Sequence, residues 1–143
     1  MKSIRKITGV VATMAALTLG TVLPATATAN AATLEQKTFI WRGFMSAGSC
    51  TIEPGATWTL YSNGTARLDA TVSSLDDDDA WLMWAHMKDS RGALLGDIQV
   101  YGSTSTKFVK NLHDRRTYRW IAKGQFDPDL FDLVKRMSLG KHC

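Results

Sequence analysis

Alternation of apolar and polar residues, interrupted by turn residues, constrains this chain more than any other feature of its sequence. Residues 57–61 and 65–72 both alternate, and Ser62-Asn63-Gly64 separates them. Asn-Gly supplies the positive φ angles that a tight hairpin turn requires. The second run places four apolar side chains on one face: Ala66, Leu68, Ala70 and Val72. We therefore predict a hairpin with one face in the core and one in water.

Further strands follow the same pattern. Residues 80–88 and 93–101 predict a second hairpin, with Asp89-Ser90-Arg91-Gly92 as its turn. Shorter β-like runs occupy residues 38–44, 106–110 and 117–122.

The C-terminal segment begins with a helix signal. Asp127-Pro128 is typical of a helix start, with Asp as N-cap and Pro at the first helical position, so we expect a short helix to about Asp132. Residues 133–140 could extend this helix or form a closing strand, and we favour the strand.

These elements predict an all-β fold, either an antiparallel sandwich or a small barrel, with seven to eight short strands and one short helix near the C-terminus. A parallel α/β sheet is excluded by the tight turns between the runs. The sequence also contains neither G-x-x-x-x-G-K-[ST] nor G-x-G-x-x-G, so no nucleotide ligand is expected.

The first 31 residues read as a secretory signal peptide. Residues 1–6 are basic, residues 9–23 are mostly apolar, and Ala29-Asn30-Ala31 offers small residues before a cut at Ala32. Ala27-Thr28-Ala29 has the same small-residue pattern two residues earlier and is an alternative cleavage signal. Because the apolar segment is too short to span a bilayer, we expect an extracellular protein without a stable membrane anchor, with residues 32–143 as its single β domain.

Export gives the two cysteines a role. An oxidising compartment favours a disulfide between Cys50 and Cys143, and neither residue lies in a thiol-catalysis or metal motif. The alternative is that Cys143 pairs between chains.

Charge is unevenly distributed along the mature chain. Residues 32–100 hold five Lys and Arg against nine acids, whereas residues 101–143 hold nine against four. The basic residues gather in one segment with aromatic residues between them: Lys107, Phe108, Lys110, Arg115, Arg116, Tyr118, Arg119, Trp120 and Lys123. This mix is typical of a groove for single strands or an anionic glycan. The alternative is that the charges face the acidic half or water.

The strand at residues 80–88 is apolar on both faces. Trp81, Met83, Ala85 and Met87 share one face, and Leu82, Trp84 and His86 share the other. The second face is either covered by the C-terminal segment or exposed as an interaction patch. A Trp beside a His on a sheet face can stack a sugar ring or a peptide side chain.

The acidic run Asp76–Asp79 is a candidate Ca²⁺ site, but it lacks the alternating ligands, central Gly and distal Glu of an EF-hand loop. We therefore favour a solvated loop. His86, His113 and His142 have no zinc-ligand spacing, so neither a metal nor a cofactor is expected.

Three parts of the chain are informative for comparison with known families: Gly48-Ser49-Cys50, the acidic run leading into Asp79-Ala80-Trp81-Leu82-Met83-Trp84, and Cys143. Together with the short length and export signal, they resemble an uncharacterised family of small secreted actinobacterial proteins. This resemblance implies a secreted single domain with no assigned activity.

The sequence therefore predicts a secreted, monomeric, non-enzymatic β domain that binds an extracellular polysaccharide, a cell-wall glycan or a protein. The candidate ligand-binding residues are Trp84, His86, Arg115, Arg116, Arg119 and Trp120. Two alternatives are a small hydrolase that uses Asp and His side chains, and an inhibitor of another protein.

Overall fold

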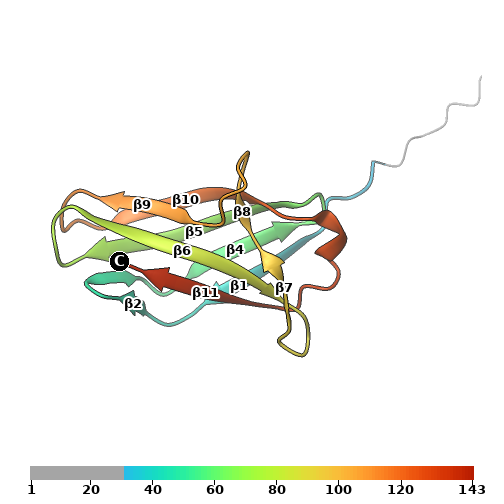
Figure 1. Ribbon diagram of the computed structural model, residues 1–143, viewed down its shortest axis with the longest axis horizontal. Helices are drawn as coiled ribbons and strands as arrows, with labels where there is room; N and C mark the ends of the chain where they lie inside the picture. The colour runs from blue at the N-terminus through green and yellow to red at the C-terminus, as the bar shows by residue number, and fades with distance from the viewer. Residues whose placement is uncertain (1–30) are drawn as a thin grey trace, which may run out of the picture. The chain divides into compact units, whose positions relative to one another are not determined.

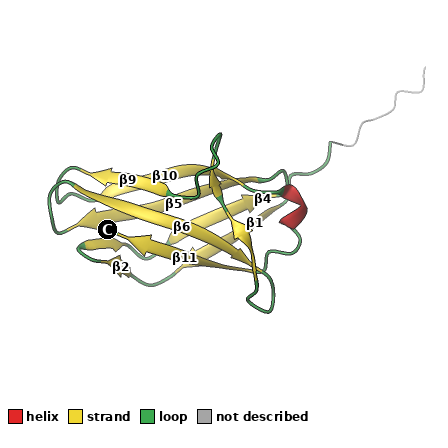
Figure 2. Cartoon of the chain, in the orientation of Figure 1, coloured by secondary structure: helices red, strands yellow, loops and turns green. Residues whose placement is uncertain are grey.

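The computed structural model describes residues 31–143, of which Ala32–Cys143 form one unit. The predicted signal peptide, except for Ala31, lies outside the described residues. Two antiparallel sheets pack face to face (Figure 1), and turns and loops connect their strands (Figure 2). Within residues 31–143, no helix is both long enough and apolar enough to cross a membrane.

The larger sheet has seven strands arranged around the long strand β5. Its strands are β1 (Gln36–Trp41), β2 (Met45–Ala47), β3 (Cys50–Ile52), β4 (Ala56–Tyr61), β5 (Thr65–Ser74), β8 (Gln99–Val100) and β10 (Tyr118–Gln125). One edge of β5 pairs first with β4 and then with β3, while β10 pairs along the opposite edge. The predicted 57–72 hairpin is confirmed as β4 and β5, and Gly64 adopts a φ of 83° in its turn.

The smaller sheet has four strands centred on β6. Its members are β6 (Asp79–Lys88), β7 (Leu94–Asp97), β9 (Phe108–Leu112) and β11 (Arg136–His142). β11 pairs along one edge of β6, whereas β7 and β9 share the other edge. The closing strand favoured from the sequence is therefore confirmed as β11.

The chain crosses from the smaller to the larger sheet at Ile98. The predicted strand 93–101 is divided into β7 and β8, which belong to different sheets. Ile98 between them is fully buried, and its N–H donates to the carbonyl of Ala85 at 2.9 Å. This crossing ties the two layers together.

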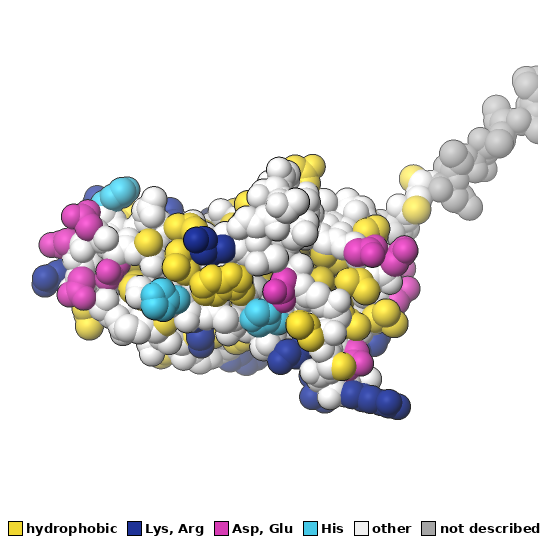
Figure 3. All heavy atoms as spheres, viewed as in Figure 1, with side chains coloured by type: hydrophobic (Ala, Val, Ile, Leu, Met, Phe, Trp, Pro, Cys, Tyr) yellow, Lys and Arg dark blue, Asp and Glu magenta, His cyan; other side chains and the backbone are white. Residues whose placement is uncertain are grey.

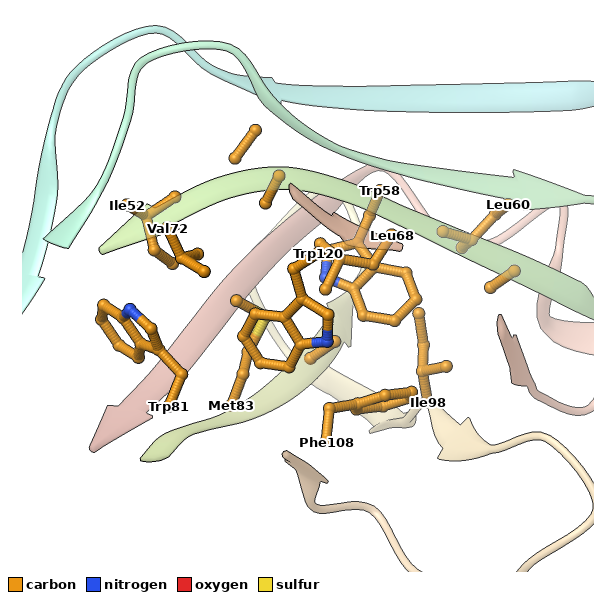
Figure 4. Close-up of a cluster of buried hydrophobic side chains, with 14 of the residues drawn as sticks. Ile52, Trp58, Leu60, Leu68, Val72, Trp81, Met83, Ile98, Phe108 and Trp120 are labelled. Atoms are coloured by element: carbon orange, nitrogen blue, oxygen red, sulfur yellow. The ribbon is translucent and has the colours of Figure 1, made fainter. Parts of the chain in front are cut away.

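Alternating side chains from the two inner faces form the core (Figure 4). Trp58 and Trp81 are fully buried, and the ring of Trp58 meets that of Phe108 edge-on, with centroids 5.0 Å apart. Trp81 Nε1 donates to the carbonyl of Thr51 at 3.3 Å. Because the strands contribute large aromatic side chains, truncating one of them should cost about 3–5 kcal/mol.

Two contacts fasten the C-terminal segment to the larger sheet. The predicted disulfide Cys50–Cys143 is present, with a Cα–Cα distance of 5.8 Å. At the other end of the segment, Lys37 Nζ donates to the carbonyls of Phe131 and Val134. Burial of this ammonium group lowers the pKa of Lys37. The segment is thus held at both ends of β11.

The all-β prediction is confirmed, and of the two architectures left open the structure is a sandwich of two sheets and not a closed barrel. Two expectations need correction. Residues 31–143 form eleven strands instead of seven to eight, and the additional ones are only two to four residues long. The expected short helix is a single 3₁₀ turn, Pro128–Leu130. Asp127 does cap it by accepting from Asp129 N–H, but Phe131 and Val134 are then drawn into the core, and the helix ends.

Candidate functional site

The strand β6 separates a buried face from a partly exposed one, as its alternation predicts. Trp81, Met83, Ala85 and Met87 are buried in the core, and the next residues along the strand point outward. The side chain of His86 is 31% exposed, and Trp84 is also partly exposed. This face stays open because β11 pairs beside β6 instead of lying across it.

Neighbouring strands complete this outer face. Val109 of β9 lies opposite Leu82, Asp97 of β7 lies opposite His86, and Gly140 of β11 lies opposite Trp84. We call the following set the Trp84 platform: Leu82, Trp84, His86, Asp97, Val109 and Gly140. Figure 3 shows this side of the molecule, with hydrophobic side chains between two histidines.

Gly140 lets the Trp84 side chain lie close to the sheet. A Cβ atom at Gly140 would lie 3.4 Å from Trp84 Cβ and 3.5 Å from Cε3 of the indole. The six-membered ring therefore covers the glycine, an arrangement in which an aromatic side chain shields a backbone that has no side chain of its own. The Trp84 side chain remains partly exposed.

His86 is oriented by a carboxylate. Its Nδ1 lies 2.6 Å from Asp97 Oδ1, so Nδ1–H donates to the carboxylate. Nε2 is on the Gly140 side, since a Cβ there would lie 3.2 Å from it. When Nδ1 carries the proton of a neutral imidazole, Nε2 is a hydrogen-bond acceptor. The platform thus places an acceptor beside the indole.

Asp97 also lines an open pocket of about 650 Å³. Its polar lining comes largely from amide, phenol and carboxylate groups: Asn63, Gln99, Tyr101, Gln125 and Asp127. The Gln125 amide is fixed because its Oε1 accepts from Gly102 N–H at 3.0 Å and its Nε2 donates to the Ser103 carbonyl at 3.2 Å. Tyr101 is 52% exposed. The pocket therefore offers several ordered hydrogen-bonding groups beside an aromatic ring.

The three arginines predicted from the basic segment are paired with acids. Arg119 donates to both oxygens of Asp69, at 3.0 and 2.7 Å, and this hydrogen bond lowers the pKa of Asp69. Arg116 donates to Asp114 at 2.7 Å, and Arg115 lies 3.8 Å from Asp77. Arg115 and Arg119 therefore face the acidic half of the chain, whereas Arg116 pairs within its own segment.

Trp120 does not reach the surface. It is 3% exposed and lies in the core among Trp58, Met83 and Phe108 (Figure 4). Alternation along β10 directs its side chain inward, opposite Ala70 of β5. Trp120 is therefore a core residue that has little surface to offer a ligand.

The acidic run does not converge on one point. Asp79 turns toward the sheet, where its carboxylate accepts from the Ser74 and Ser49 hydroxyls, and these hydrogen bonds lower its pKa. Asp76, Asp77 and Asp78 are exposed. In residues 31–143, the grouping of potential metal ligands is Cys50, Asp79 and Cys143. Both sulfurs are already bonded to each other, so this set offers no thiolate.

Sequence reasoning placed Trp84 and His86 together on one face of the strand, but it did not pair His86 with Asp97 or Trp84 with Gly140. Asp97 lies beside His86 because of the register between β7 and β6. Gly140 lies beside Trp84 because of the register between β11 and β6. The only local signal for Gly140 is a glycine inside a predicted strand, which indicates close approach by another group.

Comparison with known proteins identifies a family. A family model described as a family of unknown function (DUF6294) matches residues 57–143. This range includes every residue of the Trp84 platform. The searches of curated proteins and of solved structures gave no match.

Proposed function

The chain belongs to this family of unknown function, and we propose that it is a secreted, non-enzymatic β domain that binds an extracellular polysaccharide through the Trp84 platform. One observation carries the proposal: the partly exposed Trp84 indole lies against Gly140, with His86 beside it.

The platform has the two features that a sugar chain requires. A pyranose ring has apolar C–H faces that stack on a flat aromatic ring, and its hydroxyl groups need donors and acceptors at the edge of that ring. Trp84 supplies the stacking surface, and His86 Nε2 supplies an adjacent acceptor. The pocket beyond Asp97 offers further hydrogen-bonding groups to a longer chain.

Secretion is part of the proposal and has separate support. The first 31 residues have the order of a signal peptide, and the disulfide between Cys50 and Cys143 suits an oxidising compartment. A secreted protein meets polysaccharides at cell surfaces.

The experiment is a pull-down of the purified protein with insoluble cell-wall and polysaccharide preparations, followed by titration with the soluble glycan that competes. Trp84→Ala should weaken binding about tenfold, which corresponds to about 1.4 kcal/mol. Gly140→Ala should also weaken binding, because its Cβ would lie 3.2 Å from His86 Nε2 and push this nitrogen away from its position beside the indole.

Two control variants separate the platform from general effects. Phe44→Ala removes an aromatic side chain that is 69% exposed outside the platform. Gly43→Ala adds a methyl group where nothing lies within 4 Å. Both should bind like the wild type. Equal loss with Phe44→Ala, or capture of a protein and no glycan, would contradict the proposal.

A second candidate function is hydrolysis by His86 and Asp97. The 2.6 Å contact between Nδ1 and Oδ1 is the arrangement that orients a histidine as a general base, and Ser138 lies opposite His86 on β11. Activity profiling on glycan, peptide and ester substrates distinguishes the two functions, since a binding domain leaves every substrate intact. A His86→Ala-sensitive activity would favour the hydrolase.

A further inference from the structure

A second surface lies where the two sheets meet at β9 and β10, and it shares only Val109 with the Trp84 platform. It is an open groove of about 470 Å³, and three of its lining residues are Lys107, Lys110 and Lys123. No acidic residue lines it. We call it the lysine groove.

The lysines of this groove differ from the arginines of the same segment. Arg115, Arg116 and Arg119 each have a carboxylate within 4 Å, whereas none of the three groove lysines forms a salt bridge within residues 31–143. Lys123 Nζ lies 3.8 Å from the ring centroid of Tyr101, and Lys110 Nζ lies 5.6 Å from that of Tyr118. A ring holds an ammonium group in place without neutralising its charge.

The apolar part of the groove is also accessible. Val109 on β9 is 47% exposed, and Ile121 on β10 is 51% exposed. Positive charge above an exposed apolar strip suits a chain that carries anionic groups on an otherwise weakly polar backbone. Lys107 and Lys110 are three residues apart, which corresponds to about 10 Å along a strand. The charges are therefore distributed along the groove.

The aromatic residues argue against nucleic acid. Single strands are bound by stacking successive bases on open aromatic rings. Here Phe108 and Trp120 are 2% and 3% exposed, and the rings of Tyr101 and Tyr118 already have lysine ammonium groups over them. The groove offers charge without a free stacking surface.

From these observations we infer that the lysine groove binds an anionic polysaccharide, such as a sulfated or uronic-acid chain. This inference does not depend on the Trp84 platform. In this proposal three lysines of the basic segment, at the boundary between the sheets, contact the ligand. The arginines that are paired with acids do not.

The test uses heparin as the polyanion probe. Binding is measured against salt concentration, because each lysine that neutralises an anionic group should add roughly 0.7–0.9 to the slope of log K against log salt. The triple substitution Lys107→Gln, Lys110→Gln and Lys123→Gln should reduce affinity at least tenfold and lower the slope by roughly 2 to 3.

A charge-matched variant controls for bulk attraction. Arg42, Arg91 and Lys135 are exposed and lie outside the groove, so replacing all three with Gln removes the same charge. This variant and Trp84→Ala should both retain heparin binding, which separates the lysine groove from the platform.

Four results would overturn the inference. The first is no heparin binding by the wild type, and the second is equal loss in the charge-matched variant. The third is tighter binding of a thymidine oligonucleotide than of heparin at the same salt. The fourth is self-association of the groove variant with unchanged heparin binding, because lysines also protect open strand edges. A thermal melt of each variant verifies that it is folded.

Discussion

Removal of the Cys50–Cys143 disulfide should strongly destabilise this domain. The bridge joins residues 93 positions apart, so it closes a loop that includes most of the described chain. In the chain-entropy model a loop of this length restricts the unfolded state by about 4.7 kcal/mol at 25 °C. Typical small domains are stable by about 5–15 kcal/mol, so the loss would be a large share of the total.

The assay is urea denaturation of the oxidised protein and of the double variant Cys50→Ala, Cys143→Ala. With an m-value of about 2 kcal/mol per molar, the variant should unfold at about 2 M lower urea. A reducing agent should move the wild type toward the variant and leave the variant unchanged. Equal midpoints for the oxidised wild type and the variant would refute the reasoning, since they would mean that the loop is already restricted in the unfolded chain.

Two further predictions concern the larger sheet. Gly64→Ala should destabilise the protein by about 2 kcal/mol or more, because φ is +83° and the new Cβ would lie 2.6 Å from the Phe126 carbonyl oxygen; thermal melts should show no matching loss for Gly43→Ala. Asp69→Asn should reduce the acid sensitivity of folding. The Arg119 hydrogen bond holds the pKa of Asp69 below its usual value, so its stabilising effect is present above that usual value and is lost as pH falls through the folded pKa. Melting temperatures measured from pH 6 to pH 2 should therefore fall less steeply in Asp69→Asn, and identical slopes would contradict this.

Much of the fold follows from local patterns in the sequence. The β4–β5 hairpin was predictable because Asn63-Gly64 fixes the turn and alternation fixes the buried face. The division of the 93–101 strand was not, because it depends on Ile98 reaching the core between the sheets. The 3₁₀ turn was mistaken for a helix because capping signals describe a start and not a length.

The candidate site was predictable only along one strand. Alternation placed Trp84 and His86 on the same face, but alternation alone does not say which face of a strand is buried. That ambiguity explains Trp120, which was expected at the surface and lies in the core. Contacts between strands, such as Arg119 with Asp69, depend on register and were not accessible from one sequence.

The order of the strands along the chain has a consequence for biosynthesis. β6 is made well before β11, so until β11 arrives its outer face lacks Gly140 and one of its edges is unpaired. In a nascent chain that extends only to the end of β10, the Trp84 side chain therefore lacks its contact with Gly140. The unpaired edge of β6 is then available to chaperones or to other chains. The proposed ligand surface and the protection of that edge are completed in the same step, when β11 docks and Cys143 meets Cys50.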